Sequence, residues 1–246
     1  MKTELLHGDY RKVLRGAKAD LVVTSPPYNI GSNSPAVTGR RRNGGYDPKS
    51  YRSITDYRDS MSEDAYQDWQ LKFLYWCSEH LNAGGTLCYN HKPRRRRGAM
   101  IHPMQWVGQC EALTLMEEVI WDRGSTHNHG RGLMWPTTER VYVLRRTNDS
   151  YALDNYRDRE LPFRRDLWRI NPQVAGAHNA PFPELLVEQC VRAFTVAGQT
   201  VCDPFAGSGT VAVVSQRLDR HFIGAEKLKK YWKLAMRRME KVNARG

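Results

Sequence analysis

The chain has 246 residues, of which 38 are Lys or Arg and 26 are Asp or Glu, so its formal net charge is +12. Apolar residues make up 40% of the chain and charges of both signs are present, which indicates a globular protein and excludes a disordered tail. No window supplies the roughly 18 apolar residues that span a membrane, and the start MKTELLHGDY lacks the apolar centre of a signal peptide. We therefore expect a soluble protein with no membrane association.

The five cysteines are odd in number and widely spaced, with no CxxC pair among them. This pattern argues against a disulfide framework or a zinc site and favours a reducing cytoplasm. The excess of positive charge indicates a polyanionic partner such as nucleic acid.

Short apolar runs alternate with helical patterns, which predicts an α/β sheet with helices on both faces. The run 19–24 ends at two prolines and reads as a buried strand, and Ser62 is a candidate N-cap for a helix that Gly84 and Gly85 terminate. Further strands are predicted at 86–89, 117–121, 140–144, 200–203 and 221–225, and further helices from Pro183 and over 211–218 and 228–242.

Three polar stretches, 31–60, 92–100 and 123–134, read as loop insertions in a single domain that spans residues 1–246. The last of them contains His127 and His129. Two histidines with no third ligand nearby are typical of a polar loop, so we expect no metal.

The segment Asp203-Pro-Phe-Ala-Gly-Ser-Gly-Thr210 lies between a predicted strand and a predicted helix. Glycines at such a turn let the backbone approach a ligand closely, and Glu226, 19 residues after Gly207, ends the next strand where it could bind ribose hydroxyls. The pattern indicates a nucleotide site. It is not a P-loop, because no Lys-Ser/Thr pair follows the glycines.

The second informative segment, Thr24-Ser-Pro-Pro-Tyr-Asn29, also follows a predicted strand. Two prolines remove two N–H donors, so the backbone there offers carbonyl acceptors in a rigid arrangement. Ser25 adds an acceptor oxygen and Tyr28 a flat ring. Such a site suits a planar substrate that carries an amino group.

Together, these two segments resemble the motifs of the S-adenosylmethionine-dependent DNA amino-methyltransferases of the β arrangement, in which the catalytic motif precedes the cofactor motif. Similar family motifs are His7-Gly8-Asp9, Val119–Asp122, Pro136–Arg140, Asp166–Ile170 and His178–Pro183. The resemblance implies a Rossmann-like, doubly wound, mostly parallel sheet of the class I methyltransferase type, with its motifs in circularly permuted order. It also implies a bacterial or phage-infected cell.

The resemblance assigns roles to individual residues. Ser25, Pro26, Pro27 and Tyr28 would grip a target base, which must be flipped out of the duplex. The implied cofactor-binding residues are Asp9, Thr24, Asp203, Phe205, Ala206, Gly207, Ser208, Gly209, Thr210 and Glu226, with Glu226 on the ribose and Asp9 on the adenine.

Ser in place of Asp at position 25 favours cytosine-N4 over adenine-N6 in this family, and adenine-N6 is the alternative. An RNA methyltransferase, a protein amide methyltransferase and an inactive DNA-binding module are rival hypotheses. The segment 145–165, where many relatives carry a recognition domain, is short, so a short site or relaxed specificity is expected.

Two arginine runs, Arg40-Arg41-Arg42 and Arg94-Arg95-Arg96-Arg97, follow the Ser25 loop and the predicted strand 86–89. In a parallel sheet both would emerge at the ligand-binding edge, so we predict that they contact DNA phosphates. The alternative is a solvated basic loop. We expect a monomer or a homodimer.

Overall fold

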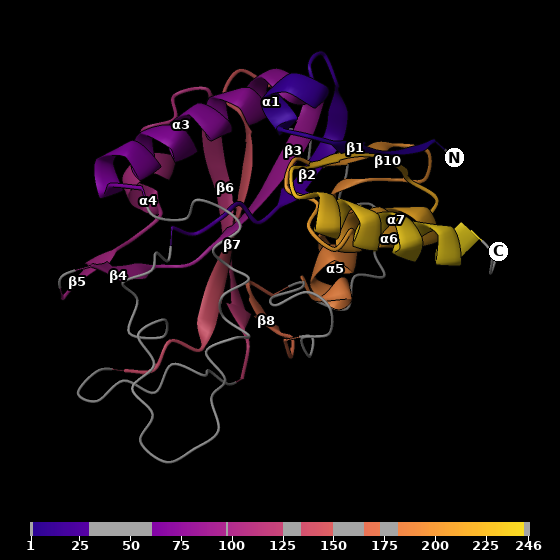
Figure 1. Cartoon of the computed structure of the whole chain (residues 1–246). Helices are drawn as coiled ribbons and strands as arrows, with labels where there is room; N and C mark the ends of the chain where they lie inside the picture. The colour runs from indigo at the N-terminus through magenta and orange to yellow at the C-terminus, as the bar shows by residue number, and fades with distance from the viewer. Residues whose placement is uncertain are drawn as a thin grey trace.

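The computed structural model describes residues 2–29, 61–96, 98–124, 134–149, 165–172 and 182–243. Within these ranges, no helix combines the length and the apolar character that crossing a membrane requires. The α/β prediction is confirmed, because a central sheet carries helices on both faces (Figure 1).

The main sheet has eight strands in the order β1-β10-β9-β2-β3-β7-β6-β8. Neighbouring strands pair in parallel except at β7, which runs antiparallel to both β3 and β6. The strands are β1 (Thr3–His7), β2 (Ala19–Thr24), β3 (Leu81–His91), β6 (Leu113–Asp122), β7 (Thr138–Arg146), β8 (Leu167–Arg169), β9 (Thr200–Asp203) and β10 (His221–Glu226).

Alternate residues of the central strand β2 face two separate cores. Leu21 and Val23 belong to one apolar cluster, and Val22 belongs to the other, all three being fully buried. A strand that is buried on both faces reads as a continuous apolar run, which is why this segment was recognisable from sequence.

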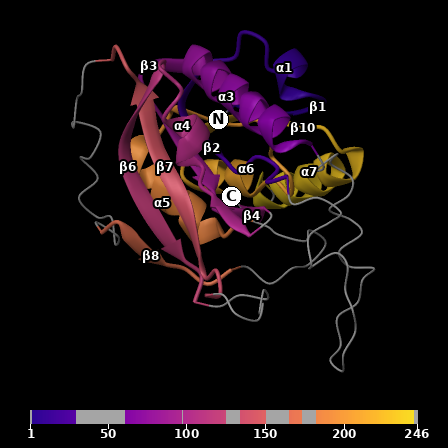
Figure 2. The same ribbon diagram turned by 90° about the vertical axis from the view of Figure 1, so that its left-hand side faces the viewer.

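Helices cover both faces of the sheet (Figure 2). The cluster that contains Val22 also contains residues of α1 (Tyr10–Val13), α3 (Glu63–His80) and α4 (Met104–Val107). The cluster that contains Leu21 includes residues of α5 (Glu184–Phe194), α6 (Thr210–Arg217) and α7 (Lys229–Asn243).

Helix α3 begins as predicted but ends differently. The Ser62 side chain accepts a hydrogen bond from the Ala65 N–H, which confirms it as the N-cap. The helix ends at His80, and β3 begins at once at Leu81 rather than after Gly84-Gly85. Leu81 makes this possible, because its N–H still bonds the Cys77 carbonyl while its own backbone is extended and pairs with Ala19.

The predicted loop 92–100 is instead largely a hairpin, formed by β4 (Arg94–Arg96) and β5 (Ala99–Ile101). The run of arginines did not indicate this hairpin, because a two-stranded hairpin tolerates charged side chains on its open face. Most of the predicted insertions 31–60 and 123–134, and of the segment 145–165, lies outside the described residues.

Smaller differences concern element ends. Pro183, predicted to be the first helical residue, is instead the N-cap of α5 with an extended backbone, and the helix begins one position later at Glu184. The short elements β1, α1, α4, β5 and β8 carried no clear periodicity and were not predicted.

Candidate active site

The candidate site lies at the edge of the sheet where the parallel strands end. β2 pairs with β9, and the sheet continues from this pair through β10 and β1 on one side and through β3, β7, β6 and β8 on the other. In such a doubly wound sheet, a crevice opens at the carboxyl ends of the two strands. Thr24 and Asp203, the last residues of β2 and β9, are both buried, and Thr24 Oγ1 donates to Asp203 Oδ1 at 2.9 Å.

The glycine turn, residues 204–209, folds back onto the end of β10. Asp203 Oδ1 also accepts the Phe205 N–H at 3.0 Å, and Gly207 N–H donates to Glu226 Oε2 at 2.9 Å. Gly207 and Gly209 have φ of +52° and +78°, values that favour glycine. The turn thus presents its backbone between two buried carboxyl groups.

Burial dominates the electrostatics of Asp203. It raises the pKa of this carboxyl to about 7, an effect to which the nearby Glu226 charge adds and which the Phe205 and Thr24 hydrogen bonds oppose. No Lys, Arg or His forms an ion pair with Asp203 within the part of the chain that is described. A buried carboxylate without a cation suits a positively charged ligand.

Aromatic rings hold Phe205 in place beside the turn. Its ring meets Tyr10, Trp69 and Phe73 edge to face, with centroids 5.0, 5.9 and 5.1 Å away. Phe73 itself is fully buried in the core between α3 and the sheet.

Asp9 lies at the end of β1, beside the end of β10, where it caps α1. Its carboxylate accepts from the Arg11 backbone N–H and from the Arg11 guanidinium at 2.9 and 2.7 Å, and this pairing lowers the Asp9 pKa. Its role toward an adenine stays a prediction.

The loop of residues 25–29, predicted to be the catalytic loop and called so below, is organised around the Tyr28 hydroxyl. Tyr28 Oη lies 2.7 Å from Ser25 Oγ, 2.6 Å from Asn90 Oδ1 and 3.1 Å from Glu139 Oε2. Burial, followed by the Glu139 charge, raises the pKa of Tyr28 well above its ordinary value, so the phenol is neutral.

The backbone of this loop is anchored on both sides of Tyr28. The Pro27 carbonyl accepts from Tyr66 Oη at 2.9 Å, and the Asn29 carbonyl accepts from the Arg96 guanidinium at 2.8 Å. Asn29 adopts φ +53°, and its side chain bonds both the N–H and the carbonyl of Met61. Ring and carbonyls are therefore held in one arrangement.

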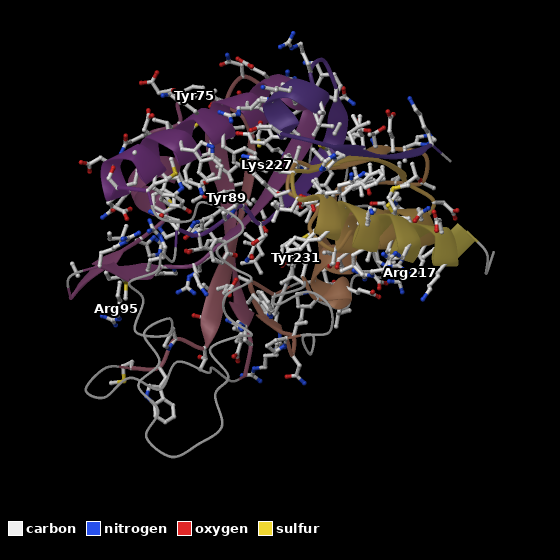
Figure 3. The ribbon with its side chains drawn as sticks, viewed as in Figure 1. Tyr75, Tyr89, Arg95, Arg217, Lys227 and Tyr231 are labelled. Carbon is white, nitrogen blue, oxygen red and sulfur yellow. The ribbon has the colours of Figure 1, made fainter. Side chains whose placement is uncertain are left out.

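A buried chain of hydrogen bonds supports the Pro27 carbonyl from the core. Trp106 Nε1 donates to Tyr89 Oη at 3.0 Å, and Tyr89 Oη donates to Gln70 Oε1 at 2.9 Å. Gln70 Nε2 then donates to Tyr66 Oη at 2.6 Å, and Tyr66 completes the chain to Pro27. Figure 3 labels Tyr89 in this region, between α3 and the sheet. Every donor along the chain finds an acceptor, which stiffens the loop.

The predicted DNA-contacting arginines separate into different environments. Arg94 is a correction: it is 7% exposed, its guanidinium pairs with Glu63 at 2.7 and 3.0 Å, and it lies 4.3 Å over the Tyr66 ring. Its charge is used inside the protein. Arg96 binds Asn29 and approaches Glu63 at 3.5 Å.

Arg95 alone of the described members of the run is exposed, on the hairpin at the lower left of Figure 3. The remaining predicted contacts, Arg40, Arg41, Arg42 and Arg97, lie outside the described residues. Among the residues that the structure does cover, no group of three or more His, Cys, Asp or Glu side chains could hold a metal.

Three contributors were missed in the sequence. Asn90 and Glu139 reach Tyr28 from β3 and from the start of β7. Arg238, on α7, donates to the Ser208 carbonyl at 2.8 Å and to Glu184 at 2.9 Å. It braces the glycine turn. Of these three residues, only Glu139 lies in a motif noted in the sequence, Pro136–Arg140, and that motif did not show what Glu139 contacts.

Comparison with known proteins agrees with this geometry. A family model described as DNA methylase, of the N6/N4 type, matches residues 19–237. The Type II methyltransferase M2.DpnII of Streptococcus pneumoniae is 27% identical over 98% of this chain and 91% of that protein. M.Cfr9I of Citrobacter freundii, also a Type II methyltransferase, is 37% identical over 51% of this chain and 40% of its own length.

Two solved structures share the fold. Protein TTHA0409 of Thermus thermophilus, in complex with S-adenosyl-L-methionine, superposes with a TM-score of 0.67 at 25% identity, covering 98% of this chain and 94% of its own. The cytosine-N4-specific PvuII DNA methyltransferase superposes with a TM-score of 0.72 at 18% identity, covering 99% and 91%. The latter likeness concerns the fold alone.

The glycine turn yields a stability prediction. A Cβ at Gly209 would lie 2.7 Å from the Ala235 Cβ in α7, whereas a Cβ at Gly198, with a similar φ of +83°, would meet nothing within 4 Å. Gly198→Ala should therefore cost about 1 kcal/mol through its backbone alone, and Gly209→Ala about 2–4 kcal/mol because the clash is added. Urea unfolding of both variants measures the difference. Equal losses would contradict close packing of α7 on the turn.

Proposed function

This chain belongs to the N6/N4 DNA methylase family, and from that premise we propose that it methylates the exocyclic amino group of a flipped-out base in DNA, with cytosine-N4 as the preferred target. The observation that carries the proposal is the contact between Thr24 and Asp203, which brings the catalytic loop and the glycine turn together across 179 residues of chain. Residues 1–246 act as one catalytic domain in this proposal. The Type II methyltransferase relatives suggest a modification enzyme with a defined site.

The cofactor of the family is S-adenosylmethionine, and the residues present suit it. When bound, it supplies an electrophilic methyl group on a sulfonium sulfur. Asp203 is buried and has no cation partner among the described residues, which suits it to the positive charge of the methionine part, and the buried Glu226 carboxylate is suited to the ribose hydroxyls. Phe205, Gly207 and Gly209 would line the methionine part.

The rest of the predicted cofactor set forms or supports the turn. Thr24 orients Asp203 through its hydroxyl, Ala206 and Ser208 belong to the turn itself, and Thr210 is the first residue of α6. Asp9 would reach the adenine from the end of β1.

The catalytic loop is built to accept an amine. Ser25 Oγ and the Pro26 carbonyl would accept the two amino N–H groups, while Pro27 and Asn29 have carbonyls engaged by the protein. An exocyclic amine is a poor nucleophile, because its lone pair is delocalised into the ring, and two acceptors favour a pyramidal nitrogen. Tyr28, anchored by its hydroxyl, would stack on the base, so that rate enhancement comes mainly from positioning.

Ser25 supports cytosine-N4 as the target. A neutral serine stands where adenine-N6 enzymes of this family more often have Asp, and this residue is the feature on which the preference rests. Adenine-N6 methylation is the second candidate, because either base offers an amino group of the same geometry.

Product analysis tests the function. The protein, incubated with labelled S-adenosylmethionine and duplex DNA, single-stranded DNA, RNA or protein, should label DNA, and mass spectrometry of the nucleosides should show N4-methylcytosine. The double variant Ser25→Ala/Tyr28→Ala should lose transfer and keep cofactor binding. Label in RNA or protein alone would refute the proposal, and methylated adenine without methylated cytosine would refute the base preference.

Asp203 makes cofactor affinity depend on pH. With a pKa of about 7 in the free protein, the carboxyl is protonated at pH 6 and must lose its proton to bind a cation. S-Adenosylmethionine should therefore bind about tenfold more tightly at pH 7.5 than at pH 6.

The Asp203 carboxyl also makes the free protein less stable as pH rises from 4 to 7, since the folded state holds the proton more tightly than the unfolded chain.

Calorimetric titration of S-adenosylmethionine into the wild type and into Asp203→Asn at both pH values measures the change in cofactor affinity. The asparagine variant should bind weakly at both pH values with no such trend; a trend that persists would mean that another group titrates.

Arg95 is the exposed described member of the run 94–97, and we propose that it contacts a DNA phosphate. Replacing Arg95 by Ala should reduce the slope of log affinity against log salt by about 1. Arg192→Ala is the matched control. Arg192 lies near the C-terminal end of α5 and is paired with Glu188, so this variant should leave the slope unchanged. Fluorescence anisotropy at several salt concentrations gives both slopes, and identical slopes would place Arg95 away from DNA.

A further inference from the structure

We propose that Glu139 is the end of a hydrogen-bonded relay that runs from Ser25 through Tyr28, polarises the Ser25 oxygen and receives the proton that the methylated amine releases. The proposal rests on the amino-methyltransferase function proposed above and assigns a role to a residue at the start of β7. Glu139 acts through Tyr28 and Ser25 and is therefore a positioning residue.

The geometry of the relay is continuous. Ser25 Oγ lies 2.7 Å from Tyr28 Oη, and Tyr28 Oη lies 3.1 Å from Glu139 Oε2, although Tyr28 and Glu139 are 111 residues apart in sequence. Glu139 is only 6% exposed. These three side chains converge because the start of the antiparallel strand β7 lies at the same edge as the end of β2, with β3 between them.

The acceptors around Tyr28 set the direction of the hydrogen bonds. Asn90 Nδ2 donates to the Arg140 carbonyl at 2.9 Å, which turns Asn90 Oδ1 toward Tyr28 at 2.6 Å. This oxygen and the Glu139 carboxylate both accept, so the single Tyr28 proton points toward them. Ser25 must then donate its own proton to Tyr28, which leaves the Ser25 lone pairs free for the amine.

Glu139 supplies the negative charge of the relay. Its Oε1 lies 3.0 Å from Arg123 and 3.9 Å from Lys92, an arrangement that suits a carboxylate. Ser25 is neutral, and burial keeps Tyr28 neutral as well. In a buried chain each hydrogen bond polarises the next, so the carboxylate makes Ser25 a stronger acceptor than an isolated hydroxyl. Ser25 thereby gains part of the acceptor strength that an aspartate would have at this position.

The proton balance is complete. As the N–CH₃ bond forms and the S–CH₃ bond of the cofactor breaks, the sulfonium becomes a thioether and the nitrogen must lose one proton. That proton passes to Ser25 Oγ, the Ser25 proton passes to Tyr28 Oη, and the Tyr28 proton passes to Glu139 Oε2. Glu139 afterwards releases it to solvent, and Asn90, an amide, cannot take this part.

Single-turnover methylation of duplex DNA under saturating S-adenosylmethionine tests the relay. Glu139→Gln keeps a hydrogen-bond acceptor and loses the base, so the rate should fall about tenfold to a hundredfold while cofactor affinity and Tm stay near the wild-type values. Glu118→Gln, a half-exposed partner of Arg140 on β6, is the matched control and should keep the wild-type rate.

Chemical rescue separates this role from a structural one. Formate should restore part of the rate to Glu139→Ala. It should not restore the rate of Tyr28→Phe, because that change interrupts the relay. Tyr28→Phe also tests the relay if the Glu139 variants fold poorly. A wild-type rate in Glu139→Gln or in Tyr28→Phe would overturn the relay. So would recovery of Glu139→Gln by a second change, Arg123→Gln, because Glu139 would then serve only to neutralise Arg123. Absence of methylation by the wild type would instead refute the proposed function.

Discussion

The parallel pairing of β2 with β9 is the constraint on which the candidate active site depends. It joins two strand ends that are 179 residues apart and allows Thr24 to bond Asp203. Because side chains alternate along a strand, a one-residue slip would move Leu21 and Val23 out of one core and turn Thr24 away from Asp203. The two apolar clusters that hold the register therefore also hold the catalytic loop against the glycine turn.

Two kinds of polar environment meet at this edge. At the glycine turn, Asp203 is buried with no cation partner in the part of the chain that the structure covers, and a bound cation would relieve the cost of its burial. On the loop side, the chain from Trp106 to Pro27 satisfies each of its donors within the protein. The first environment suits a positively charged ligand, and the second holds in place the acceptors that we propose for the target base.

Local chemistry made part of this readable in advance. The bounds of β2 and β9 match the predicted ones, because an apolar run between turn-forming residues indicates a strand that is buried on both faces of the sheet. Arg94 could not be assigned in this way. Its neighbours in sequence are arginines, yet Glu63 and Tyr66, which decide that it is buried, come from a helix some 30 residues earlier. Residue type indicated a charge, and only packing determined what the charge faces.

The sequence by itself determined the α/β class, the two motifs and the order in which they occur, because these depend on local periodicity and on residues that are close in the chain. Tertiary structure alone decided that Asn90 and Glu139 reach the Tyr28 hydroxyl and that Arg238 braces Ser208. Those contacts join separate strands and helices, and their geometry follows from strand order and register. No pattern within a single segment contains that information.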